Sequence, residues 1–110
     1  MAVVEARLAF EAAVVSRIVW LGEHAPEAWL DNFLAALETL RREIGSFPDA
    51  APPLKQDARV VVRQRRFPAG LPYVVYYAHL REEPVRTVYL THLFHERQRR
   101  PQIDLGEWPW

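Results

Sequence analysis

The sequence predicts an α+β fold, in which a helical hairpin packs on one face of a small, mostly antiparallel sheet of three to four strands. Three observations lead to this prediction. Apolar residues recur at helical spacing over the first half of the chain, and they alternate with polar residues in three segments of the second half. The connections between those segments are short enough for antiparallel neighbours.

The chain is expected to begin with a strand followed by a helix. Met1–Phe10 alternates loosely, which predicts a first strand. From Glu11 the apolar period becomes helical and stops near Gly22–Ala25. The residues of this stripe are Val14, Val15, Ile18, Val19 and Leu21.

The second helix has the clearest pattern in the sequence. Pro26 and Glu27 suit a helix start, and Gly45 is a suitable C-terminal cap. Because the two helices are joined by a short turn, they are expected to form an antiparallel hairpin that buries its stripes on the sheet. The stripe of the second helix consists of Trp29, Phe33, Leu37, Leu40 and Ile44.

The second half of the chain predicts the sheet. Ser46–Leu54 contains three prolines and is expected to be an irregular loop. Strands are predicted over Ala58–Phe67, Pro72–Leu80 and Val85–His95. Arg97–Trp110 has no period and is interpreted as a tail, so one face of the sheet should stay partly open.

Length and composition restrict the class of protein. The 110 residues predict one domain, 1–110, with 101–110 as its C-terminal tail. The absence of cysteine excludes disulfides, thiolate metal ligands and cysteine nucleophiles. No apolar run approaches the roughly 20 residues that cross a bilayer, and the N-terminus does not resemble a signal peptide. A cytoplasmic location is therefore expected.

Charge is distributed unevenly although the formal net charge is zero. Residues 1–54 hold four arginines against eight acidic residues, whereas residues 55–100 hold ten basic residues against four acidic ones. Residues 101–110 add two acidic side chains. The predicted sheet thus carries a local charge of +6, which suits an anionic or acidic partner.

Several short motifs occur in the order typical of one family. Ser46-Phe47-Pro48 precedes a strand with basic residues at Arg63–Phe67, and the next strand reads Pro-Tyr-Val-Val-Tyr-Tyr over residues 72–77. The last strand ends as Leu-Phe-His-Glu-Arg-Gln over residues 93–98. From about Ala6 to Pro101, the chain resembles the RelE/ParE superfamily of type II toxin–antitoxin toxins. It departs from that pattern at Glu96, where glycine is usual, and at His92, where many relatives have arginine.

The resemblance implies a growth-arresting toxin that a cognate antitoxin neutralises, and operator DNA would be bound only through the antitoxin complex. ParE-like members inhibit DNA gyrase, and RelE-like members cut mRNA on the ribosome. The residues of these motifs are closer to the ParE-like branch. A protein with a pI near 6.9 is also poorly suited to approaching the polyanionic ribosome. Two alternatives stay open: a metal-independent endoribonuclease, and an inactive interaction module in which the Glu96 carboxylate weakens phosphate binding.

Candidate site residues follow from the resemblance and from the chemistry. Cleavage beside a ribose 2′-hydroxyl needs cations for the phosphate and a group that transfers protons. A nuclease would use His95, Arg97, Arg63, Arg66 and Tyr77, with His92 as an alternative acid or base. An acidic antitoxin segment or the target would be bound by Arg63, Arg66, Arg86, Arg97 and Tyr76.

Strand alternation limits how many of these residues share a face. Arg63 and Arg66 should lie on opposite faces, and so should His92 and His95. Of the two sets of tyrosines, one is expected in the core. No metal site and no cofactor are predicted, and His24 and His79 are interpreted as incidental. Trp108 and Trp110 are expected to dock on the protein's own core or on a partner.

Overall fold

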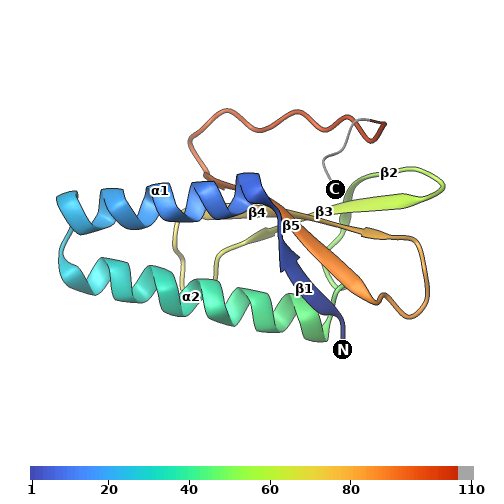
Figure 1. Ribbon diagram of the computed structural model, residues 1–110, viewed down its shortest axis with the longest axis horizontal. Helices are drawn as coiled ribbons and strands as arrows, with labels where there is room; N and C mark the ends of the chain where they lie inside the picture. Colours follow the sequence, from blue (N-terminus) through green and yellow to red (C-terminus); the bar gives the residue numbers. More distant parts are fainter. Residues whose placement is uncertain (107–110) are drawn as a thin grey trace.

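The computed structural model describes residues 1–106 and confirms the α+β class (Figure 1). One five-stranded sheet has the order β1-β5-β4-β3-β2, in which β1 is parallel to β5 and all other neighbours are antiparallel. The elements are β1 (Val3–Ala6), α1 (Leu8–His24), α2 (Glu27–Ser46), β2 (Pro53–Gln56), β3 (Val60–Arg66), β4 (Tyr73–Leu80) and β5 (Thr87–His95).

The two helices form the predicted antiparallel hairpin, which lies on one side of the sheet (Figure 1). The helices bury their stripes of side chains in one core with side chains of β4, β5 and β1, because an amphipathic helix is stable only when its apolar face is covered. The fully buried members of this core include Phe10, Phe33, Leu40, Ile44, Val75, Tyr77, Val88 and Leu90.

Gly45 has a packing role instead of the predicted capping role. Helix α2 continues through it to Ser46, and the backbone N–H of Ala2 donates to the Gly45 carbonyl over 2.8 Å. A Cβ at Gly45 would lie 3.2 Å from the Ala2 carbonyl oxygen and 3.3 Å from Cγ2 of Val4. The missing side chain therefore lets the N-terminal strand approach the end of α2 closely.

The register of β3 and β4 divides their side chains between two faces. Arg63 lies opposite Tyr77, and Arg66 lies opposite Val74. Partners across an antiparallel ladder point to the same side, so Arg63 shares the face that the helices cover and Arg66 shares the other. We call these the helix face and the tail face.

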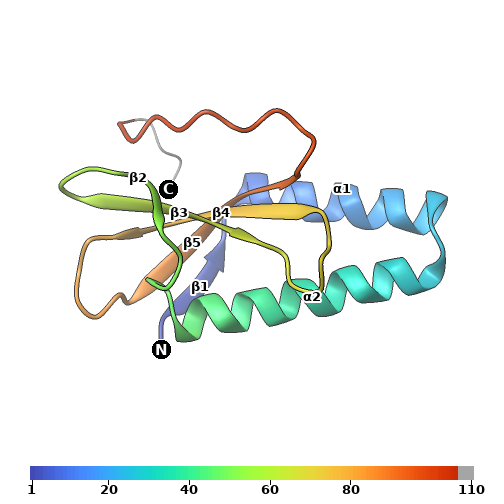
Figure 2. The ribbon, with the colours of Figure 1, turned by 180° about the vertical axis from the view of Figure 1, so that it is seen from behind.

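The tail face is covered, contrary to the expectation of a partly open sheet. The segment after β5 runs back over β4 and β3 (Figure 2). Ile103 and Leu105 pack on a second cluster made by the tail-face side chains, and the Lys55 ammonium donates to the Ile103 carbonyl over 2.7 Å. That second cluster consists of Val60, Val62, Val74, Tyr76, Ala78 and Phe94.

Two further predictions need correction. The segment expected to be irregular contains the edge strand β2, which gives five strands in place of three to four. Pro53 is tolerated there because an edge strand does not need every N–H for the ladder. The first helix begins at Leu8, three residues earlier than its apolar period indicates.

Candidate functional site

The residues predicted for a nuclease are distributed over both faces of the sheet. His95 lies opposite Tyr73 on the helix face, and Arg66 lies on the tail face. Arg63 is on the helix face opposite Tyr77, four residues from Tyr73 along β4. Because a strand residue advances the chain by about 3.3 Å, the backbones of Arg63 and His95 are separated by roughly 13 Å along β4.

Arg63 uses its guanidinium inside the protein. Its Nε–H donates to Nε2 of His79 over 3.1 Å, and Nη1 donates to the carbonyl oxygen of Ala51. These contacts join β3 to β4 and to the loop before β2. The Arg63 guanidinium therefore forms hydrogen bonds within the fold.

Arg66 and Arg97 lie near the end of β5, beside His95. The Arg66 guanidinium forms an ion pair with the Glu96 carboxylate. The backbone N–H of Arg97 donates to Nδ1 of His95 over 3.1 Å, and the Arg97 side chain is exposed. The Glu96 carboxylate thus neutralises one of the two cations at this end of the sheet.

The two candidate tyrosines are both core residues. Tyr77 is 1% exposed on the helix face and Tyr76 is 2% exposed on the tail face. Burial raises the pKa of Tyr77, although the charge of Arg63 opposes this effect. The Tyr76 ring packs edge to face on Phe94, with centroids 4.9 Å apart. Neither ring is placed to stack on a nucleic-acid base.

Arg86 lies far from the other predicted arginines. It directly precedes β5, whereas His95 ends that strand, a separation of roughly 30 Å along the strand. Its backbone N–H donates to the Glu82 carboxylate over 3.2 Å. The predicted basic strip of Arg63, Arg66, Arg86 and Arg97 is therefore not continuous.

The histidines of β5 point to opposite faces, as strand alternation predicts. His92 lies opposite Tyr76 on the tail face, and His95 lies opposite Tyr73 on the helix face. Within residues 1–106, no three His, Asp or Glu side chains gather as metal ligands would. Over the same residues, neither helix combines the length and the apolar character that crossing a bilayer requires.

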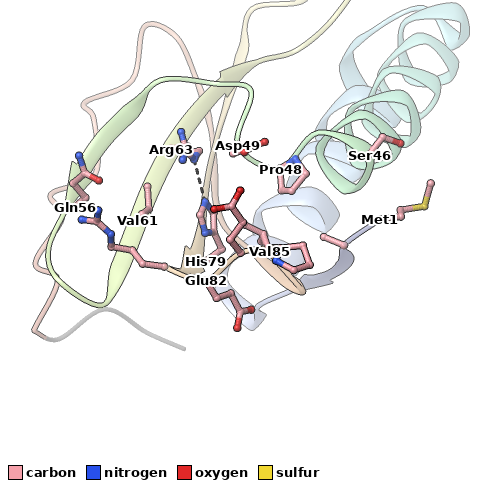
Figure 3. Close-up of a pocket in the computed structure, with 14 residues that line it drawn as sticks. Met1, Ser46, Pro48, Asp49, Gln56, Val61, Arg63, His79, Glu82 and Val85 are labelled. Carbon is pink, nitrogen blue, oxygen red and sulfur yellow. Dashed lines mark hydrogen bonds between the residues drawn. The ribbon is translucent and has the colours of Figure 1, made fainter.

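A polar cavity of about 640 Å³ lies beside Arg63 and His79, between the end of α2 and the β4–β5 connection (Figure 3). Its walls carry both signs of charge, because Arg63 and Arg81 are accompanied by Asp49, Glu82 and Glu83. Such mixed walls do not select an anionic ligand.

His79 is a structural residue of this cavity and not the incidental one that the sequence suggests. It is 3% exposed, its Nδ1–H donates to the Leu80 carbonyl over 2.7 Å, and its Nε2 accepts from Arg63. Burial lowers the pKa of His79, and the hydrogen bond to Leu80 opposes that effect. Burial also lowers the pKa of His92. The Arg63 contact requires the neutral form of His79.

The free energy of unfolding is expected to fall as the pH drops below about 6.5. The unfolded chain then takes up protons on His79 and His92 that the folded chain resists, because both folded pKa values are lowered. Urea denaturation at about pH 7.5 and about pH 5.5 measures this loss. In His79→Gln the side-chain amide still offers Arg63 an acceptor but does not titrate. This variant should therefore lose less stability than the unsubstituted protein between the two pH values. An equal loss in both proteins would contradict the role given to His79.

A groove lies at the tip of the helical hairpin, where α1, the start of α2 and the β3–β4 turn meet. Its larger hollow, of about 390 Å³, has walls of Trp20, Trp29, Phe33 and Leu71. A smaller hollow of about 110 Å³ includes Ala13, Ser16, Leu93 and Gln98. Arg17, Tyr73 and His95 line both hollows and form the ridge between them. We call the two hollows together the hairpin-tip groove.

The ridge is built from stacked side chains. The Arg17 guanidinium lies 5.3 Å from the Tyr73 ring centroid and 5.4 Å from that of Trp20. Cations over aromatic faces are attracted by the ring quadrupole. The His95 ring meets Tyr73 edge to face at 5.8 Å, which fixes His95 at the same ridge.

Sequence reasoning found His95 but not the other members of the hairpin-tip groove. Arg17 and Trp20 lie on α1 and Trp29 lies on α2, and no candidate site residue is predicted on either helix. One signal was available: Trp20 and Trp29 lie on either side of the short turn between the helices. A hairpin places such residues near one another at its tip. Trp108 and Trp110 lie outside the described residues.

Comparison of the chain with protein-family models, with curated proteins and with solved structures found no match.

Proposed function

We propose that the chain is the toxin of a type II toxin–antitoxin system of the RelE/ParE kind. It acts by binding a protein, with DNA gyrase as the target, and is neutralised by a cognate antitoxin. The motifs over residues 46–98 support the family. The element order, with a leading strand, a helical hairpin and then an antiparallel sheet, agrees with it.

One observation favours protein binding over RNA cleavage: the side chains needed for cleavage do not converge. Metal-independent cleavage needs a proton-transfer group and cations within reach of one phosphate. Arg63 is bonded to His79 and Ala51 on the helix face, Arg66 is on the tail face and Tyr77 is buried. At the end of β5, His95 and Arg97 are accompanied only by the Arg66 guanidinium, which is paired with the Glu96 carboxylate.

Glu96 strengthens this preference. Its carboxylate forms the ion pair with Arg66 beside His95. A phosphate approaching that end of the sheet would be repelled by Glu96 and would compete with it for Arg66. A protein target with polar and basic side chains meets no such obstacle.

The antitoxin is proposed to be an acidic segment that folds on binding. Arg97 provides an exposed cation at one end of β5 and Arg86 provides one at the other. Arg63 does not belong to this surface, because its guanidinium is bonded within the fold. The positive charge proposed to face the acidic antitoxin thus comes from two separate arginines, Arg86 and Arg97, and does not form a continuous strip.

Induced expression of the chain in a bacterial host is expected to stop growth with an early loss of DNA synthesis and induction of the SOS response. Pulse labelling of nascent DNA and protein over the first minutes measures the order of the two losses. An early loss of translation with cut mRNA would replace gyrase inhibition with ribonuclease activity. Normal growth would identify an inactive interaction module.

His95→Ala is expected to arrest growth about as strongly as the unsubstituted chain, because a protein contact does not need proton transfer by an imidazole. Loss of a general acid or base typically costs about 10²–10⁴-fold in rate, so a nuclease would lose its toxicity. Growth curves at matched expression measure the difference, with Arg99→Ala as a control on the exposed segment after β5. Full loss of arrest in His95→Ala alone would contradict the proposal.

A further inference from the structure

We propose that the hairpin-tip groove binds an extended peptide segment that carries one large apolar side chain, one carboxylate and one small side chain at alternate positions. The groove is distinct from the polar cavity beside His79, and its smaller hollow reaches the end of β5 at His95 and Gln98. The inference goes beyond gyrase inhibition and stands on the contacts of the groove, so it holds whether or not the chain arrests growth.

The larger hollow fits a large apolar side chain. Its volume of about 390 Å³ is bounded by Trp20, Trp29, Phe33 and Leu71. Trp29 is 57% exposed and Trp20 is 46% exposed, so both indoles still have apolar surface to bury. Burying that surface under a bulky side chain is favourable by about 25 cal/mol per Å².

The ridge fits a carboxylate. Arg17 has no acidic partner among residues 1–106, and neither hollow is lined by an aspartate or a glutamate of the described chain. The Tyr73 and Trp20 rings hold the guanidinium in place without neutralising it. A positive charge fixed at the junction of two apolar hollows complements a negative charge carried between two side chains.

The arrangement of two hollows favours a peptide over a single small molecule. The smaller hollow, of about 110 Å³, continues along α1 from Arg17 toward Ala13. It has room for a small side chain, and the ridge separates it from the larger hollow. Because alternate side chains of an extended chain point to the same side, residues i, i+2 and i+4 occupy the large hollow, the ridge and the small hollow. Trp, Tyr and Arg, which form the walls and the ridge, are the residue types enriched at protein-binding hot spots.

Two blocked pentapeptides serve as probes, Trp-Ala-Glu-Ala-Ala and the reversed Ala-Ala-Glu-Ala-Trp, so that either chain direction is tested. NMR titration at millimolar peptide is expected to give saturable shifts at the assigned indole N–H signals of Trp20 and Trp29. Replacing the peptide's glutamate by lysine should weaken binding about tenfold, since the charge-assisted contact with Arg17 is lost. The complete absence of saturable shifts with both peptides overturns the inference.

Two variants of the full chain locate the site. Arg17→Gln and Trp29→Ala should each weaken binding of the better pentapeptide about tenfold, whereas Arg42→Gln, on the exposed surface of α2, should leave its affinity unchanged. Unchanged affinity in Trp29→Ala overturns the inference. Phenylacetate provides the last test: if it binds as tightly as the pentapeptide, the small hollow contributes nothing and the peptide assignment is wrong.

Discussion

Phe33→Ala is expected to lower the free energy of unfolding by about 3–5 kcal/mol, as for other buried aromatic residues truncated to alanine. Phe33 is 1% exposed and closes a triangle of rings between α2 and the β3–β4 turn. Its centroid lies 5.5 Å from that of Phe67 and 5.2 Å from that of Tyr73, and the latter two are 5.4 Å apart. Truncation removes two of the three contacts and leaves a cavity.

Chemical denaturation monitored by far-UV circular dichroism measures this loss. Trp29→Ala, one helical turn earlier on α2, is the matched control, because the Trp29 side chain is exposed and should contribute less than about 1 kcal/mol. Equal destabilisation by the two substitutions would show that the ring triangle does not hold the hairpin to the sheet.

The double substitution Ile103→Asp and Leu105→Asp is expected to lower the free energy of unfolding by about 2–4 kcal/mol. Both side chains pack on the tail-face cluster, and a carboxylate placed there would either lose its hydration or detach the segment. Detachment uncovers Val62, Tyr76 and Phe94, so the folded protein should also gain affinity for an apolar fluorescent dye.

Gln102→Asp provides the control for that substitution. Gln102 lies in the same segment but is exposed, so one added charge there should change the stability by less than about 0.5 kcal/mol. The midpoint of urea unfolding and the dye fluorescence are measured together. A double variant with wild-type stability and no dye binding would mean that the segment after β5 does not protect the sheet.

Helix α2 and the strands β3, β4 and β5 were predictable because each carries a clear periodic signal. The spacing from Trp29 to Ile44 marks one face of α2, and the structure buries most of that face. The alternation of Tyr73, Val75 and Tyr77 against Val74 and Tyr76 assigned the two faces of β4 correctly. The sequence did not reveal that both sets are buried, because burial depends on what covers the second face.

Three features escaped prediction for physical reasons. The strand β2 is short and proline-rich, and the ladder to β3 that makes it a strand is a tertiary contact. Between Tyr76 and Tyr77 the β4–β5 register shifts, which leaves Thr91 as the extra residue and puts Leu90 on the face opposite to His92. Pro101, Ile103 and Leu105 do alternate with exposed residues, but three positions are too few to identify a covering segment.

The candidate site was predictable only in part. Strand alternation predicts that Arg63 and Arg66 lie on opposite faces of the sheet, and the β3–β4 register confirms this prediction. No local pattern in the sequence predicts the hydrogen bonds that Arg63 donates to His79 and to Ala51. The hairpin-tip groove was missed for the same reason, because Arg17 and Tyr73 are far apart in the sequence and meet only when α1 lies against β5 and the turn before β4.

The parallel pairing of β1 with β5 affects when the domain can complete its fold during synthesis. Residues 3–6 pair with residues 87–90, so those later residues must leave the ribosome before the first strand can join the sheet. Until then the apolar stripes of α1 and α2 have no completed sheet to cover. A nascent chain stalled before Thr87 therefore exposes the surface on which chaperones and proteases act, and the domain gains its protection from them only after residues 87–90 have been made.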